Sequence, residues 1–199
     1  MNSMVRTRKG EVVQDPPFMV KLTSHPLAGL LWLPLRIWLG YQWFDAAMHK
    51  VNNPAWVATG EALKGYWANA IKIPETGRPP ISFDWYRSFL QFMLDAQAYT
   101  WFAKLVAYGE LLIGIALIIG AFTGIAAFFG GFMNWNFMMA GSASTNPLLF
   151  VIAVGLILAW KVSGYFGADF FLLRLLGTPW RGKPVSDEAP AQTVGPVRG

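Results

Sequence analysis

Cysteine is absent from the 199-residue chain, and charged residues make up only 14% of it. Without cysteine the chain can form no disulfide, thiolate-held metal site, iron–sulfur cluster or dithiol redox centre of its own. Soluble domains carry roughly 25% charged residues, so the composition argues against a water-soluble globule. The net charge of +5 does not indicate a nucleic-acid partner, because the basic residues gather near the two ends of the chain.

Hydrophobic and aromatic residues take the place of the missing charge. They make up 54% and 16% of the chain, and ten tryptophans and fifteen phenylalanines are among them. A small soluble core cannot bury that many large rings, whereas a bilayer accommodates them in its core and at both interfaces. The composition therefore predicts an integral membrane protein that has the lipid bilayer as a partner.

Four segments are apolar enough to be predicted spans, since about 20 apolar residues cross the hydrocarbon core. One charge, Glu110, interrupts the stretch from Leu105 to Met133, which is too long for one span and must turn near Phe122. The predicted spans are residues 27–48, 98–121, 124–141 and 147–164. We therefore expect an all-α fold: an integral membrane four-helix bundle with two short amphipathic helices in its outer loop, 49–97.

The segments outside the spans give the expected topology. Lysines and arginines flank the first and the last span, so the positive-inside rule places both termini in the cytoplasm. Residues 1–26 are then a cytoplasmic N-terminal tail, 27–180 the transmembrane domain, and 181–199 a cytoplasmic tail whose composition predicts disorder. Residues 166–176 are expected to form a further amphipathic segment on the inner surface.

Capping signals predict two helices in the outer loop. Asn53 followed by Pro54 is typical of a helix start, and apolar residues then recur at helical spacing up to Ala70. Ser82 is the predicted cap of a second helix, which carries Trp85 and further apolar residues at the same spacing.

Polar residues inside the predicted spans are functional candidates, because an ionisable group in hydrocarbon must be paired or hydrated. By rise per residue, Arg36 and Glu110 lie at similar depths, with Asn134 nearby. Small residues share the face of each charge, which is typical of helix contacts. The two stripes are Gly29, Arg36, Gly40, Ala47 and Ala103, Ala107, Glu110, Gly114. We expect an Arg36–Glu110 pair, which either serves the chemistry or simply fixes the helix register.

A second polar layer is expected near the outer rim. Asp45 and Lys104 fall at similar heights, with Gln42, His49, Lys50 and Asn53 adjacent to them. The surrounding rings, Tyr41, Trp43, Tyr99 and Trp101, are interpreted as interfacial anchors rather than a substrate box. His25 and His49 fall on opposite sides of the membrane, so no haem or metal is expected to be held by this chain.

The order of the motifs resembles the DoxX/DoxD family over residues 27–180. The resemblance rests on Arg36-Ile-Trp-Leu-Gly40 with Asp45 and Lys50, on Tyr108–Gly120, on Asn134–Met139 with Ser142 and Asn146-Pro147, and on Gly164–Asp169. The insertion with Trp85-Tyr-Arg87 is similar to the longer members, which are related to the small DoxD subunit of thiosulfate:quinone oxidoreductase.

The resemblance implies a multi-pass protein of the prokaryotic plasma (inner) membrane, joined to a DoxA-like subunit or another membrane-complex subunit. Its implied activity passes electrons from thiosulfate to a quinone acceptor and forms tetrathionate. The candidate catalytic residues are Glu110, as a proton relay, and Arg36. The candidate substrate- and quinone-binding residues are Asn134, Gln42, Asp45, Lys50, Lys104 and Arg87.

Two other functions remain as alternatives. The chain can be a non-catalytic integral subunit that packs into a larger respiratory or photosynthetic complex. Association of several copies of this chain into a homo-oligomer also stays open. A small transporter is disfavoured, because no span is visibly interrupted at mid-membrane and no inverted repeat is present.

Overall fold

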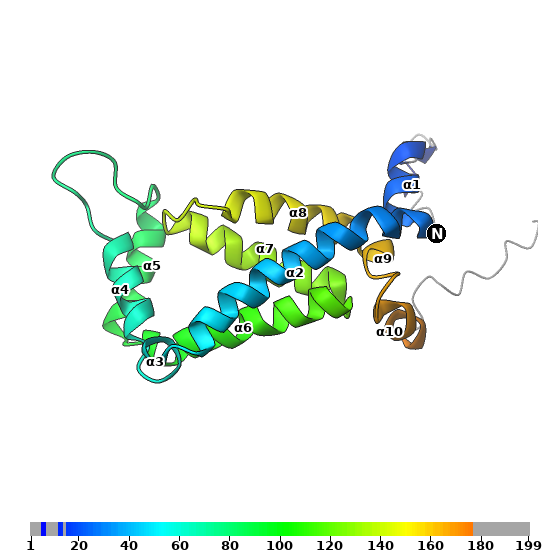
Figure 1. Cartoon of the computed structure of the whole chain (residues 1–199). Helices are drawn as coiled ribbons and strands as arrows, with labels where there is room; N and C mark the ends of the chain where they lie inside the picture. The colour runs from blue at the N-terminus through cyan, green and yellow to red at the C-terminus, as the bar shows by residue number, and fades with distance from the viewer. Residues whose placement is uncertain (1–4, 7–11, 14, 177–199) are drawn as a thin grey trace, which may run out of the picture.

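The structure, a computed structural model, describes residues 5–6, 12–13 and 15–176 and is helical apart from one two-residue strand pair (Figure 1). Its four long helices lie side by side as a bundle. They are α2 (Gly29–Val51), α6 (Tyr99–Ile119), α7 (Thr123–Met139) and α8 (Asn146–Leu158). The predicted all-α class is confirmed.

The four helices correspond to the four predicted apolar segments, with shifted ends. Residues 98–121 and 124–141 match α6 and α7 closely, and the turn between them runs from Gly120 to Phe122, both at positive φ. The segment 147–164 is not one helix, because the helix breaks at Ala159 into α8 and a single turn, α9 (Trp160–Ser163).

Three helices lie across one end of the bundle, which we name the α5 end: α3 (Pro54–Val57), α4 (Glu61–Ala70) and α5 (Asp84–Asp95). The Asn53 cap is confirmed, since its side chain accepts from the Ala55 amide at 3.0 Å. The prediction of two helices is wrong by one, because Gly60 at φ 77° separates α3 from α4. The Ser82 cap is wrong too: α5 begins at Asp84 without a side-chain cap.

The opposite end, which we name the α10 end, holds α1 (Pro17–Ser24), the 3-10 turn η1 (Pro26–Ala28), α9 and α10 (Asp169–Leu175) (Figure 1). The helix α10 lies within the predicted segment 166–176, whereas α1 was not expected in the N-terminal tail. The strands β1 (Val5–Arg6) and β2 (Val12–Val13) form one antiparallel pair. The predicted disordered tail, 181–199, lies outside the described residues.

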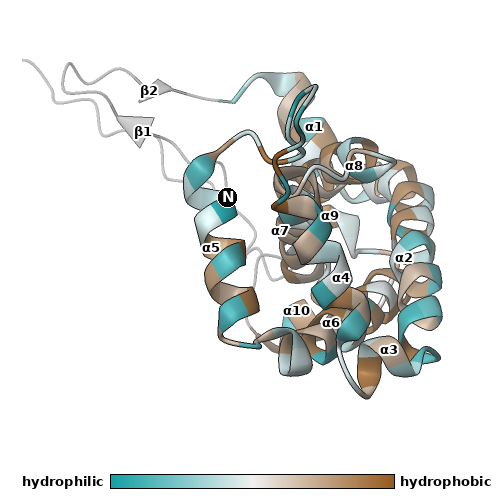
Figure 2. Cartoon of the chain, turned by 90° about the vertical axis from the view of Figure 1, so that its left-hand side faces the viewer, coloured by the Kyte–Doolittle hydropathy of each residue, from teal (hydrophilic) through white to brown (hydrophobic). Residues whose placement is uncertain are grey.

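The buried side chains form two clusters. One fills the bundle interior around Leu39, Trp43 and Leu117, and the other joins α4 and α5 to the start of α6 around Leu63, Trp67 and Leu90. The view along the bundle in Figure 2 shows hydrophobic residues over much of the long helices, including their outer faces, while α5 alternates between hydrophilic and hydrophobic residues. In the described chain, α6 is the one helix whose length and composition fit a membrane span.

Candidate functional site

The seam between α2 and α6 is built from the two predicted stripes. All eight stripe residues are buried, so the predicted faces of both helices are confirmed. Gly40 and Gly114 lie so close together that a Cβ on Gly114 would stand 2.6 Å from the Phe44 backbone nitrogen. The small residues therefore bring the two backbones together, as they do where helices pack without bulky side chains between them.

Arg36 and Glu110 lie on these faces but do not meet, so the predicted pair is wrong. Arg36, 1% exposed, donates through Nη2 to the Phe166 carbonyl at 3.1 Å, and its guanidinium lies over Gly120 and Gly167 at the α10 end. The Asp169 carboxylate acts on it electrostatically and itself accepts from the Phe122 and Thr123 amides at the start of α7.

Glu110 pairs instead with Lys50, which lies in the last turn of α2. The Lys50 Nζ is 2.6 Å from Glu110 Oε2 and 5.3 Å from the centre of the Trp56 ring. The Glu110 side chain is 1% exposed and that of Lys50 is 18% exposed, so the ion pair closes the seam toward the α5 end. A carboxylate so deeply buried requires such a partner.

The register of the seam explains the error. The depth estimate assumed that both helices begin and end in the same planes. The contact between Gly40 and Gly114 places α6 further toward the α5 end than α2, so that Arg36 lies opposite Gly120 and the last turn of α2 lies beside Glu110. Close glycine contacts, which sequence spacing alone does not reveal, set this offset.

Asn134 is fully buried in the bundle, as expected, and lies on the inward face of α7. Neither its Oδ1 nor its Nδ2 has a hydrogen-bond partner within the described chain, and the same holds for the buried Trp43 Nε1. Trp43 Nε1 would lie 2.9 Å from a Cβ on Gly130, one helical turn before Asn134. Buried amides without partners are typical of internal water sites.

The predicted outer layer is dispersed rather than assembled. Asp45 is exposed and lies 3.7 Å from His49, Lys104 is exposed without an ion-pair partner in the described chain, and Gln42 is half-buried. Arg87 is held by the Asp84 carboxylate and by the Ile81 carbonyl, the latter at 2.7 Å. Of the surrounding rings, Tyr41 and Trp101 are exposed, but Trp43 and Tyr99 are buried.

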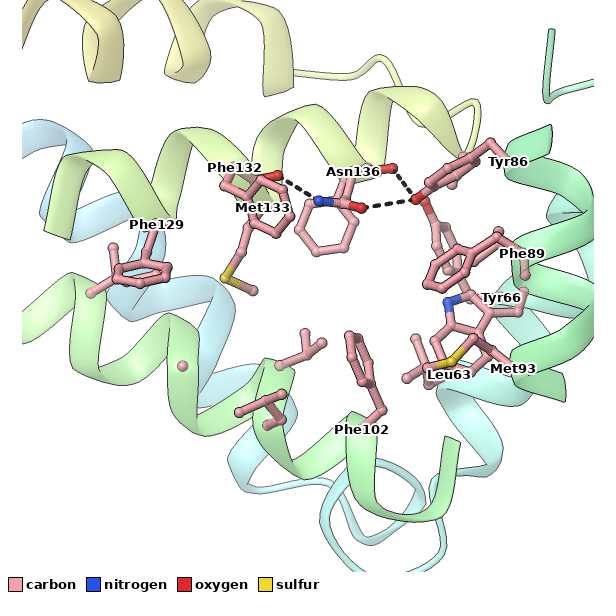
Figure 3. Close-up of a pocket in the computed structure, with 18 of the residues that line it drawn as sticks. Leu63, Tyr66, Tyr86, Phe89, Met93, Phe102, Phe129, Phe132, Met133 and Asn136 are labelled. Atoms are coloured by element: carbon pink, nitrogen blue, oxygen red, sulfur yellow. Dashed lines mark hydrogen bonds between the residues drawn. The ribbon is translucent and has the colours of Figure 1, made fainter. Parts of the chain in front are cut away.

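A cavity of about 610 Å³ lies between α6 and α7, and residues of α4 and α5 complete its lining (Figure 3). The helices α6 and α7 diverge toward the α5 end, where α4 and α5 lie across the bundle (Figure 1). Ligand sites typically measure roughly 300–1,000 Å³. No lining residue is charged, and most are aromatic or aliphatic. The lining includes Leu63, Tyr66, Trp67, Tyr86, Phe89, Phe102, Val106, Gly109, Ile113, Met133, Asn136 and Phe137.

The cavity opens sideways between α6 and α7. Four further lining residues, Leu105, Leu112, Phe129 and Phe132, are each more than half exposed on the outside of the bundle. Gly109 widens the opening, since a Cβ placed on it would meet nothing within 4 Å. An apolar molecule can therefore enter from the side of the bundle.

One edge of the cavity is polar (Figure 3). The Tyr86 hydroxyl donates to the main-chain and side-chain oxygens of Asn136, at 3.1 and 3.2 Å. Burial raises the pKa of Tyr86 to about 12, and the neighbouring Tyr66 contributes to this rise. Burial also raises the pKa of Tyr66, which the nearby Ser142 side chain partly offsets. Both phenols are therefore neutral in the physiological range.

None of the sequence-predicted site residues lines this cavity. Glu110 and Asn134 are neighbours of the lining residues Gly109 and Met133, but their side chains lie on buried faces of α6 and α7. Sequence reasoning missed Tyr86 and Tyr66, which look like ordinary residues of amphipathic helices. The one available signal was Asn136, an amide inside the predicted span 124–141 that needs a partner.

No protein-family description, curated protein or solved structure shows significant similarity to this chain. The resemblance to the DoxX/DoxD family therefore stays a prediction. Among the described residues, no group of three or more histidine, aspartate or glutamate side chains is placed to hold a metal ion.

Proposed function

We propose that this chain is a multi-pass membrane protein that binds a quinone between α6 and α7, as the membrane subunit of a quinone-linked oxidoreductase. The cavity carries this proposal, because its size, its apolar walls and its single polar edge suit an apolar ring with few oxygens. Its sideways opening, lined by exposed Leu112 and Phe132, suits a ligand that arrives from the bilayer.

The distribution of side chains over the bundle supports a membrane location. Large apolar residues are exposed along α2, α6, α7 and α8, among them Ile37, Leu112, Phe128 and Val151. The two charges deepest in the bundle, Arg36 and Glu110, are each 1% exposed. Such an arrangement, with apolar groups outside and charges inside, is stable where the surroundings are hydrocarbon.

The ends of the bundle fit the expected topology. Both α1, near the start of the described chain, and α10, at its end, lie at the α10 end in Figure 1. The first and last described helices on the same side agree with cytoplasmic placement of both tails, and α4 and α5 then lie across the outer surface. The proposed location is the plasma membrane of a prokaryote, as the resemblance implies.

The electron donor in this proposal is thiosulfate, which rests on the resemblance alone. A dianion of this kind requires cations outside the hydrocarbon, and Lys104 is exposed at the outer part of α6. Purified protein in lipid, with its co-purifying partners, should then reduce a short-chain quinone when thiosulfate is added. If this assay fails while the quinone still binds, thiosulfate is not the electron donor, but the proposed quinone site stands.

Quinone binding itself is tested at Gly109. The Gly109→Leu change should fill the cavity mouth and weaken binding of a short-chain quinone by more than about tenfold. Gly65→Leu is the matched control. Gly65 also faces open space, but it lies on the part of α4 that does not line the cavity. Equal affinity of the two variants, measured by equilibrium titration in lipid nanodiscs, would contradict the proposed site.

The alternative of a non-catalytic subunit is favoured by one observation. Phe83, Trp85 and Phe92 are exposed on or beside α5, where a neighbouring subunit can cover them. Co-purified chains without any quinone binding would support this alternative.

A further inference from the structure

The orientation of the Asn136 amide is fixed by its own helix. Its Nδ2 donates to the Phe132 carbonyl oxygen at 2.8 Å, one turn earlier on α7. With the amide turned round, two carbonyl-type oxygens would face each other at that distance, so the nitrogen must occupy this place. The Oδ1 atom is consequently the atom that faces Tyr86, as Figure 3 shows.

This orientation of the amide fixes the direction in which the Tyr86 hydroxyl donates its hydrogen. Both of its neighbours, the main-chain oxygen and Oδ1 of Asn136, only accept hydrogen bonds. The hydroxyl must therefore donate toward Asn136, and what remains for a molecule in the cavity is an oxygen lone pair. The Tyr86 hydroxyl is thus an acceptor on the ligand side.

Tyr66 supplies the opposite function. Its hydroxyl is buried and has no partner of regular hydrogen-bond geometry within the described chain. The Ser142 side chain beside it lowers the pKa of Tyr66 as a donor to the phenol oxygen does, which leaves the Tyr66 hydrogen without an acceptor. Tyr66 and Tyr86 both line the cavity, and they are close enough to influence each other electrostatically. A buried hydroxyl hydrogen without an acceptor is costly, so Tyr66 has a donor to offer to a ligand.

We propose that this edge recognises the reduced, hydroxyl-bearing form of the ring, a hydroquinone, in preference to the quinone. The inference rests on the proposed function, in which the cavity holds a quinone. A hydroquinone hydroxyl can donate to the Tyr86 oxygen and accept from the Tyr66 hydroxyl. A quinone oxygen only accepts, so it satisfies Tyr66 and leaves Tyr86 facing an oxygen without a hydrogen between them.

The test compares three ligands on the full chain in lipid nanodiscs under anaerobic conditions. They are a short-chain alkylated benzoquinone, the corresponding hydroquinone, and its dimethyl ether, which has the same ring without donors. We expect the hydroquinone to bind about fivefold more tightly than either of the others, the factor that one net hydrogen bond supplies. Because only the ligand changes, this comparison does not depend on any variant folding.

Three variants locate the preference in the protein. Tyr86→Phe should bring the hydroquinone and quinone affinities within about twofold of each other, because the acceptor is gone. Asn136→Leu removes only the Oδ1 acceptor, and the main-chain oxygen of residue 136 still holds the Tyr86 hydrogen, so the preference should shrink less than in Tyr86→Phe. Tyr108→Phe removes an exposed phenol of α6 outside the cavity and should keep the full preference.

The outcomes separate the two proposals. Equal binding of all three ligands by the unaltered chain, or a preference that Tyr86→Phe leaves intact, would overturn the hydroquinone inference and leave the quinone site standing. Absence of binding by every ligand would overturn the proposed function as well.

Discussion

Helix α6 has two sides that differ in almost every respect. Toward α2 it presents alanines, Gly114 and the paired Glu110, and the backbones touch. Toward α7 it presents Gly109, Ile113 and large apolar side chains around an open cavity. The charges inside the bundle therefore mark the closed side, where they hold helices together, whereas the ligand-sized space lies among aromatic rings. A buried charge in an apolar helix is here a sign of helix contact.

The largest loss of stability on the closed side of α6 is expected from Lys50→Met. It leaves the Glu110 carboxylate buried without its partner, which costs roughly 3–5 kcal/mol of the free energy of unfolding. Adding Glu110→Leu removes the stranded charge, so the double variant should be more stable than Lys50→Met alone. Unfolding in detergent at a fixed pH, followed for both single variants and the double variant, measures the coupling.

Additive losses from Lys50→Met and Glu110→Leu would show that the pair does not stabilise the seam. A second double-mutant cycle, with Arg36→Met and Glu110→Leu, gives a pair of residues that are not expected to be coupled. These two residues have separate partners, so their losses should add within about 0.5 kcal/mol.

A smaller change in stability distinguishes the two sides of α6 when a glycine on each side is replaced by alanine. Gly114→Ala forces a Cβ against the Phe44 backbone, which cannot move aside as a side chain can, and should cost about 1–3 kcal/mol. Gly109→Ala meets only open space and should stabilise the helix by about 0.5–1 kcal/mol. Thermal unfolding of the two variants gives the comparison, and a loss at Gly109 equal to that at Gly114 would mean that the cavity is closed.

Much of this fold could be predicted from the sequence, because the decisive signals are local. Apolar runs gave the positions of the long helices, and the spacing of small residues beside Arg36 and Glu110 gave their buried faces. The pairing of the charges could not be obtained in the same way. It depends on the offset between α2 and α6, which the contact between Gly40 and Gly114 sets, and no spacing within one helix encodes it.

The cavity escaped prediction for a related reason. Its polar edge joins Tyr86 to Asn136, fifty positions apart, after α5 has folded across the end of the bundle. Neither residue carries a chemical motif in its own segment. Ligand sites built from common apolar residues on three or four helices become visible only when those helices are placed in space.

The smallest predicted effect is a shift in the titration of Tyr86, which lines the cavity, relative to a phenol exposed to water. Tyr86 in the folded chain should lose its proton near pH 12, whereas an exposed phenol does so near about 10. Because the folded state holds this proton more tightly than the unfolded chain, its stabilising contribution is complete below about pH 10 and disappears as the pH rises through 12. The tyrosinate absorbance of the unaltered protein minus that of Tyr86→Phe isolates this one group. A midpoint for Tyr86 close to about 10 would place its hydroxyl in water, and the cavity would then be a wet surface groove rather than an apolar site.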